Sequence, residues 1–191
     1  MPQINVVAFN GSPRKNGNTA RMIRRVFTRL EAAGIGVKEI QVGGNLVRGC
    51  VACWACRKND LKRCAFDDDP MNGWIEAMQA ADGIILGSPT YFANVSTEMK
   101  ALIDRAGFSS MHLMRRKVGA PVVAARRGGA IQVYNTLMAF FGITEMVVPC
   151  SSYWNMGFGL DPGDVGKDAE AMHTMDNLGD NMAFVLQKLK C

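Results

Sequence analysis

The stretch QINVVAFNGSPRKNGNTA, residues 3–20, decides the fold. Its first seven residues form a short apolar run that ends in Asn-Gly, as a buried parallel strand does. The residues that follow the loop have apolar side chains at helical spacing, namely Met22, Ile23, Val26, Phe27 and Leu30. A strand, a polar loop and a helix in this order predict the first unit of an alternating α/β protein.

The rest of the chain repeats this alternation. Further apolar runs predict strands at residues 36–42, 83–88, 121–125 and 143–149. Helical spacing predicts helices at residues 17–33, 70–80, 96–106, 130–141 and 167–189. Five strands that alternate with helices predict a parallel, doubly wound sheet with helices on both faces. The sequence has neither an internal repeat nor a linker that would divide it.

Length and composition narrow the classes of function. The chain has 191 residues, 48% of them hydrophobic, which suits one domain with a sizeable core. A net charge of +5 is too mild to indicate nucleic acid as a partner. Neither a signal peptide nor a membrane span is visible, so we expect a cytoplasmic protein without a membrane partner. The two histidines do not accompany a G-x-S-x-G motif, and the sequence offers no evident catalytic acid or base.

The loop from Asn10 to Ala20 carries donors suited to a phosphate group. It leads into a helix N-terminus, where backbone N–H groups and the helix dipole favour an anion. Ser12 and Thr19 add hydroxyl groups, and Arg14 adds positive charge. The loop matches neither G-x-x-x-x-G-K-[ST] nor G-x-G-x-x-G, so it is neither a Walker P-loop nor a dinucleotide-binding fingerprint. The alternative is an ordinary turn with a helix cap.

Two later loops should meet the first one, because ligands of doubly wound sheets bind at the carboxyl ends of the strands. The loop in GSPTYFANVSTEMKALIDR, residues 87–105, offers aromatic faces and a stiff proline. In this stretch Ser96 or Thr97 is placed to cap the predicted helix. The loop in ARRGGA, residues 125–130, has a glycine pair that permits close approach of the backbone to a ligand.

Three motifs in this order, GSPRKNGNT, GSPTYFANVSTEMKALIDR and RRGG, resemble the NADPH-dependent FMN reductase and iron–sulfur flavoprotein branch of the flavodoxin-like superfamily. The resemblance extends from Asn5 to about Met182. It implies a flavodoxin-like five-stranded parallel sheet of order 2-1-3-4-5. It also implies a single FMN-binding domain over residues 1–191, with a cysteine-rich insertion at about 43–66. The chain departs from the family after the fourth strand, where relatives often carry a longer glycine-rich stretch ending in Gln-Glu.

The resemblance also implies which residues bind FMN. The residues that would hold the phosphate are Ser12, Arg14, Asn18 and Thr19. Those that would border the flavin ring are Pro89, Thr90, Tyr91, Phe92 and Asn94. Those that would close the other side of the ring are Arg127, Gly128 and Gly129. NAD(P)H is implied as a candidate electron donor.

The stretch GCVACWACRKNDLKRC, residues 49–64, contains four of the six cysteines in the pattern C-x2-C-x2-C-x7-C, namely Cys50, Cys53, Cys56 and Cys64. Disulfides are disfavoured in a reducing compartment. Three cysteines at two-residue gaps suit a cubane cluster, whereas zinc usually takes two separate C-x2-C pairs. The resemblance points to a [4Fe–4S] cluster. Free or reversibly oxidised thiols and a zinc site remain as alternatives. We expect Cys150 to lie in the core at the end of a strand, and we assign no role to Cys191.

The sequence therefore predicts an FMN-binding oxidoreductase that passes electrons between a [4Fe–4S] cluster and FMN, with a small oxidant or a redox protein such as a ferredoxin as partner. One rival is a cluster-free NAD(P)H-dependent FMN or quinone reductase. The other is a non-catalytic flavin-binding sensor. Apolar stretches at residues 138–146 and 153–160 predict a homodimer or homotetramer in which the cysteine segment lies near a neighbouring subunit's flavin.

Overall fold

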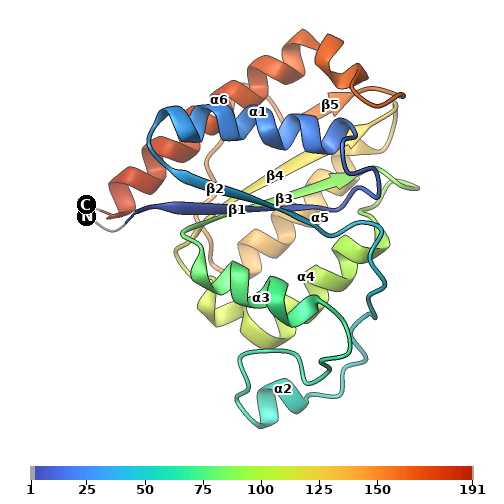
Figure 1. The fold of residues 1–191 in the computed structure, drawn as a ribbon, viewed down its shortest axis with the longest axis vertical. Helices are drawn as coiled ribbons and strands as arrows, with labels where there is room; N and C mark the ends of the chain where they lie inside the picture. The colour runs from blue at the N-terminus through green and yellow to red at the C-terminus, as the bar shows by residue number, and fades with distance from the viewer. Residues whose placement is uncertain (1–2, 191) are drawn as a thin grey trace.

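A computed structural model describes residues 3–190 as one parallel sheet with helices on both faces (Figure 1). The strand order is β2-β1-β3-β4-β5, which confirms the predicted flavodoxin-like fold. The strands are β1 (Asn5–Asn10), β2 (Gly36–Gln41), β3 (Gly83–Pro89), β4 (Val118–Ala125) and β5 (Met156–Phe158). The helices are α1 (Asn18–Ala32), α2 (Ala55–Lys58), α3 (Met71–Ala80), α4 (Thr97–Ser110), α5 (Ala130–Ile143) and α6 (Ala169–Lys190), with short 3₁₀ turns η1 (Met111–Leu113) and η2 (Asp164–Lys167).

The sheet separates two hydrophobic cores. Alternate residues of β1 point to opposite faces: Val6 and Ala8 pack with α1 and α6, whereas Val7 and Phe9 pack with α3, α4 and α5. Figure 1 shows α1 and α6 on one side of the sheet and α3, α4 and α5 on the other. Strands β3 and β4 are buried along almost their whole length, as expected for parallel strands covered on both faces.

The fifth strand differs from the prediction of residues 143–149. Helix α5 continues to Ile143, and Glu145 then adopts a left-handed φ of 55° that ends the helix. Only Val147 reaches the sheet there, through an isolated parallel bridge to Val118 at the start of β4. The chain then leaves the sheet and returns as Met156–Phe158, which pairs with the last residues of β4. The apolar run at residues 143–149 therefore touches the sheet next to β4 but does not form the fifth strand.

The cysteine-rich residues between β2 and α3 extend away from the sheet, below α3 and α4 in Figure 1. They contain only the four-residue helix α2, which the sequence analysis did not predict. Division of the chain into one domain with an insertion at about 43–66 stays a prediction. Over residues 3–190 no helix has the length and apolar character that a membrane crossing requires, and cytoplasmic location also stays a prediction.

Candidate functional site

A cavity of about 190 Å³ opens at the carboxyl ends of the strands. Its walls come from the loops after β1, β3 and β4 and from the segment after β5, as expected for a ligand site in a doubly wound sheet. The residues that line it are Ser12, Arg14, Asn18, Thr19, Pro89, Thr90, Tyr91, Ala124, Ala125, Arg126, Gly159 and Leu160. Seven of the twelve residues predicted to bind FMN thus meet at one cavity.

The loop after β1 is held in shape by polar side chains from its own strand and from β2. Asn10 accepts a hydrogen bond from the Ser12 N–H at 3.0 Å, and Gln41 donates to the Ser12 carbonyl at 2.6 Å. Gly43 lies against the same loop so closely that a Cβ placed on it would be 2.4 Å from the Gly11 carbonyl oxygen. The backbone of the loop is therefore fixed before any ligand binds.

The N-terminus of α1 faces this cavity without a side-chain cap. Gly17 occupies the cap position and makes no side-chain hydrogen bond, and the first turn carries no acidic residue. Positive potential at the helix end is consequently left for a ligand. Arg14 lines the same cavity and donates from Nη1 to the Leu160 carbonyl at 3.3 Å, which adds positive charge to the cavity wall. This wall suits a phosphate group.

Asn18 has a second task in the structure. Its side-chain oxygen accepts hydrogen bonds from the backbone N–H groups of Gly163 at 2.9 Å and Val165 at 3.2 Å. These bonds tie the segment after β5 to the start of α1, and so bring Gly159 and Leu160 into the cavity wall. Only the amide NH₂ of Asn18 is left to contact a ligand.

The loop after β3 forms a tight turn that displays its aromatic residues. Tyr91 and Asn94 exchange two backbone hydrogen bonds of 2.9 and 3.0 Å, and Phe92 and Ala93 between them have φ values of 48° and 58°. This geometry leaves the Phe92 side chain fully exposed and Tyr91 half exposed. Phe92 and Asn94 do not line the cavity, although they shape the turn beside it.

The hydroxyl group of Thr90 indicates whether the cavity suits a polar ligand. Its Oγ1 is buried and has no hydrogen-bond partner, and it is the single side-chain nitrogen or oxygen in that condition within residues 3–190. Buried polar atoms are almost always paired, because an unpaired one costs about 1–3 kcal/mol. Since Thr90 lines the cavity, a ligand with a polar atom beside it would provide the missing partner.

The loop after β4 differs from the prediction in which residues face the cavity. Arg126 lines it, whereas Arg127, Gly128 and Gly129 do not. Gly129 has a φ of 89°, and a Cβ placed on it would be 3.0 Å from the Ala93 Cα, so this glycine allows the loops after β3 and β4 to touch. Four further residues line the cavity and were not predicted from the sequence, namely Ala124, Ala125, Gly159 and Leu160.

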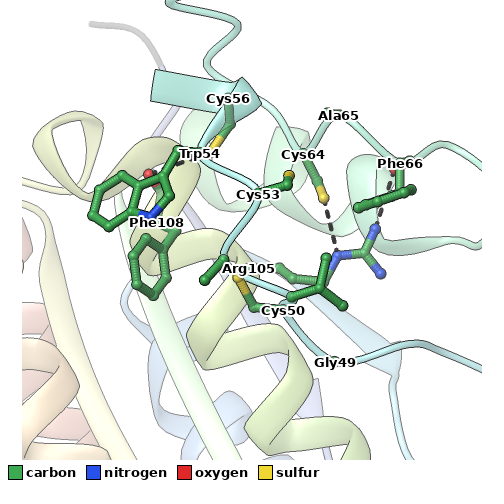
Figure 2. Close-up of a pocket in the computed structure, with 12 residues that line it drawn as sticks. Gly49, Cys50, Cys53, Trp54, Cys56, Cys64, Ala65, Phe66, Arg105 and Phe108 are labelled. Atoms are coloured by element: carbon green, nitrogen blue, oxygen red, sulfur yellow. Dashed lines mark hydrogen bonds between the residues drawn. The ribbon is translucent and has the colours of Figure 1, made fainter. Parts of the chain in front are cut away.

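A second, smaller cavity of about 20 Å³ lies within the cysteine segment (Figure 2). All four cysteines of the motif line it, together with Trp54, Phe66, Arg105 and Phe108 among others. Trp54 packs edge-on against Phe108, with ring centroids 5.3 Å apart, and so covers one side. The topology therefore gathers Cys50, Cys53, Cys56 and Cys64 around one apolar space.

The thiols of this cavity do not form a compact site for one ion. Within residues 3–190, no three Cys, His, Asp or Glu side chains are close enough together to bind a single metal. Tetrahedral zinc, with Zn–S bonds of about 2.3 Å, needs such closeness. A cubane cluster binds each cysteine at a different iron, so its four sulfur ligands lie further apart than those of a single ion. The donor chemistry fits a cluster, but the sulfurs are not in a ligating arrangement here.

The backbone around the thiols favours an anionic ligand. Ala52 and Trp54 adopt left-handed φ values of 51° and 61°, and no backbone N–H from residue 49 to 54 donates a hydrogen bond to another described residue. Alternation of backbone handedness directs successive N–H groups toward a common point, which is how proteins surround phosphates and iron–sulfur clusters. Burial raises the pKa of the Cys56 thiol, and the neighbouring thiols of Cys64, Cys53 and Cys50 raise it further. The thiolate form of Cys56 therefore needs a bound cation, such as the iron of a cluster whose total charge with its thiolates is negative.

Cys64 is the most firmly held of the four cysteines. Asn72 accepts from its backbone N–H at 2.8 Å and donates to its carbonyl at 3.2 Å. Arg105 of α4 donates from Nε to its sulfur at 3.2 Å and forms an ion pair with Asp69. Burial opposes the charge of Asp69, but hydrogen bonds from Arg105 and from the backbone N–H groups of Arg48 and Met71 outweigh it and lower the pKa of this carboxyl group.

Cys150 was predicted to lie in the core at a strand end, and this prediction was wrong. It lies outside the strands and is exposed, because the run before it does not form β5. Cys191 lies outside the described residues.

The two cavities share no lining residue, and helix α4 links them. Its cap residue Ser96 follows the loop after β3 and accepts a hydrogen bond from the Met99 N–H at 3.4 Å. Arg105, which lines the cysteine cavity, is about 14 Å further along the helix axis.

Comparisons with known proteins agree with this geometry. Residues 4–161 match the model of the family described as NADPH-dependent FMN reductase. The chain belongs to this family. It is therefore a flavin-dependent oxidoreductase, and the non-catalytic sensor loses its support.

Several proteins with similar sequences are named iron–sulfur flavoproteins. One from Methanocaldococcus jannaschii is 34% identical, with 97% of this chain and 98% of that protein covered. Another from Methanosarcina thermophila is 29% identical, covering 97% and 96% of the two chains. Among solved structures, a WrbA-like flavodoxin from Agrobacterium tumefaciens superposes with a TM-score of 0.68 at 18% identity, covering 97% of this chain and 98% of that one. RosB with a bound riboflavin-phosphate intermediate gives a TM-score of 0.76 at 15% identity, covering 98% and 80%. These structures share the fold.

Proposed function

We propose that this family member is an iron–sulfur flavoprotein, an oxidoreductase that exchanges electrons between FMN and a [4Fe–4S] cluster. The observation that carries the proposal is the presence of two separate sites of different chemistry on one fold. One is a polar cavity at a helix N-terminus with an unpartnered hydroxyl group, and the other is an apolar cavity lined by four cysteines. The printed names of the similar proteins support the same combination.

The cavity at the strand ends is the proposed FMN site. The N-terminus of α1 with Ser12, Thr19 and Arg14 would hold the phosphate, and Asn18 would fix the far wall while offering its amide. Pro89, Thr90 and Tyr91 would border the flavin. FMN when bound would supply one- and two-electron redox chemistry, and the chain would supply binding and orientation.

Three of the remaining predicted residues shape the loops beside the cavity without lining it. Phe92 and Asn94 belong to the turn beside the cavity, and Gly129 lets the loop after β4 approach that turn. We propose Arg126, rather than Arg127 or Gly128, as the residue of that loop that contacts FMN. No side chain of the cavity has the placement of an acid or base for catalysis, so the chain's contribution is positional.

The cysteine segment is the proposed cluster site, with Cys50, Cys53, Cys56 and Cys64 as ligands. Four cysteines around one space, a set of free backbone N–H groups and a guanidinium on one sulfur support it. The cluster when bound would supply one-electron transfer. Since the two cavities lie at opposite ends of the α4 segment from Ser96 to Arg105, we propose that a second copy of the chain brings its cysteine segment to this flavin, in a homodimer or homotetramer.

A cluster-free NAD(P)H-dependent FMN or quinone reductase is the second candidate. The family description and the lack of a compact thiol site within residues 3–190 favour it. The iron content of the protein separates the two candidates most sharply. The identity of the electron donor or acceptor, for example a ferredoxin, separates them less well.

Binding of FMN tests the shared part of both candidates. We expect a yellow protein that retains stoichiometric FMN on desalting after incubation with an excess. A colourless protein would contradict both. Oxidation of NADH and NADPH under anaerobic conditions, with FMN or a quinone as acceptor, then measures whether a pyridine nucleotide is the donor.

A further inference from the structure

Arg105 is a buried guanidinium, and Figure 2 shows its hydrogen bonds to Cys64 and Phe66. Its side chain is 1% exposed. Nε donates to the Cys64 sulfur at 3.2 Å, and Nη2 donates to the Phe66 carbonyl at 3.1 Å. Nη1 donates to the Arg48 carbonyl at 3.2 Å and pairs with the Asp69 carboxylate. Burial of a cation on this scale is costly unless its donors are matched, and all three guanidinium nitrogens of Arg105 donate hydrogen bonds.

These contacts join the two limbs of the cysteine segment. Arg48 lies just before Cys50, whereas Phe66 and Asp69 lie just after Cys64. Asp69 closes the arrangement, because its Oδ2 also accepts from the Arg48 N–H at 3.2 Å. Arg105 itself is on α4, a helix of the main fold. The guanidinium thus anchors both ends of the motif to the sheet-packed helix.

We propose that Arg105 is a positioning residue of the cysteine site that sets its redox potential through the hydrogen bond to the Cys64 sulfur. The proposal rests on the cluster of the proposed function. A donor on a ligand sulfur stabilises the more negative, reduced form of a cluster, so its removal makes the cluster harder to reduce. Lysine cannot replace it, since a single ammonium cannot reach the sulfur and the two limbs together.

The test compares wild type, Arg105→Lys and Arg57→Gln after anaerobic reconstitution with iron and sulfide. Iron content, FMN content and the cluster midpoint potential are measured for each. Arg57 is the matched control, because its charge lies beside the same segment but its Nε donates to the Phe108 carbonyl at 3.0 Å and not to a cysteine. We expect Arg105→Lys to keep FMN and either shift the cluster potential to a more negative value or lose iron. We expect Arg57→Gln to do neither.

Variants of Arg105 can unfold, because they leave Asp69 buried without its partner. The double variant Arg105→Gln with Asp69→Asn removes both charges and is measured in parallel. An unchanged potential and iron content in a folded Arg105 variant would overturn the proposal while leaving the cluster in place. An equal shift in Arg57→Gln would also overturn it, since it would show that general charge is responsible. Wild type that binds FMN but no iron would refute the cluster, and this inference would fall with it.

Discussion

Arg14 is the residue that would interact most directly with the FMN phosphate through its charge. It is exposed, lines the cavity and donates to the Leu160 carbonyl. We expect Arg14→Ala to weaken FMN about tenfold, because a charge-assisted hydrogen bond at an exposed position contributes on the order of 1–2 kcal/mol. Riboflavin, which lacks the phosphate, should lose much less affinity.

Lys15 is the control for Arg14, because it is adjacent and exposed but does not line the cavity. Titration of both variants with FMN and riboflavin by flavin fluorescence measures the difference. Equal losses of the two ligands in Arg14→Ala would remove Arg14 from the phosphate site. A loss of the same size in Lys15→Ala would point to net charge instead.

Replacement of Thr90 should raise the stability of the FMN-free protein but lower its affinity for FMN. Its buried Oγ1 has no partner in the chain, so Thr90→Val should stabilise the FMN-free protein by about 1 kcal/mol in chemical denaturation. The same change should weaken FMN about fivefold if the hydroxyl group bonds to the ligand. A variant with unchanged FMN affinity would show that the hydroxyl is not a ligand contact.

At the scale of elements, the loop after β1 depends on close packing against the start of the cysteine-rich connection. A Cβ on Gly43 would meet backbone atoms of Gly11 and Ser12 at 2.4 Å, and backbone cannot move aside as a side-chain tip can. Gly43→Ala should therefore displace the loop, with a cost of about 1–3 kcal/mol and a clear loss of FMN affinity. Gly73→Ala, with open space around its added methyl group, should be neutral or slightly stabilising. A Gly43→Ala protein with normal FMN affinity and stability would contradict this account of the loop.

Element prediction from the sequence succeeded where pattern and packing agree. The first four strands and five long helices follow from runs and periodicity, and Ser96 caps α4 as proposed. The failures are local structures that tertiary contacts decide. Residues 143–149 are apolar enough for a strand, but the left-handed Glu145 and the return of the chain at Met156 place β5 later. Helix α2 has only four residues, too few for a periodic signal.

At the scale of the whole molecule, several large apolar side chains after β3 and around β5 are exposed. Leu160 lines the cavity at the strand ends and is about half exposed, as are Tyr153, Trp154 and Phe158, and Phe92 on the turn after β3 is fully exposed. Such a surface is typical of an interface between subunits. We expect a dimer or tetramer by light scattering at micromolar concentration, and Phe92→Ser with Trp154→Ser should shift it toward monomer. A monomeric wild type would contradict the proposed assembly.

The two sites could be predicted only in part, because each depends on contacts distant in sequence. Loops after parallel strands meet by topology, so Ser12 and Thr90 could be placed in one cavity from the sequence. The far wall could not, because Leu160 reaches Arg14 across 146 residues. Arg105 gave no local signal either, since it meets Cys64 across 41 residues. Nothing in the composition of α4 indicates that this arginine is buried.

The central claim is that one chain carries both FMN and a cluster held by the four cysteines. Anaerobic purification followed by analysis of FMN, iron and acid-labile sulfide tests it most directly, with Cys64→Ser and Cys150→Ser measured beside wild type. We predict one FMN with about four irons and four sulfides per wild-type chain. We predict that Cys64→Ser loses or converts the cluster but keeps FMN, and that Cys150→Ser matches wild type. Wild type with full FMN and no iron, or equal iron in Cys64→Ser, would contradict the claim.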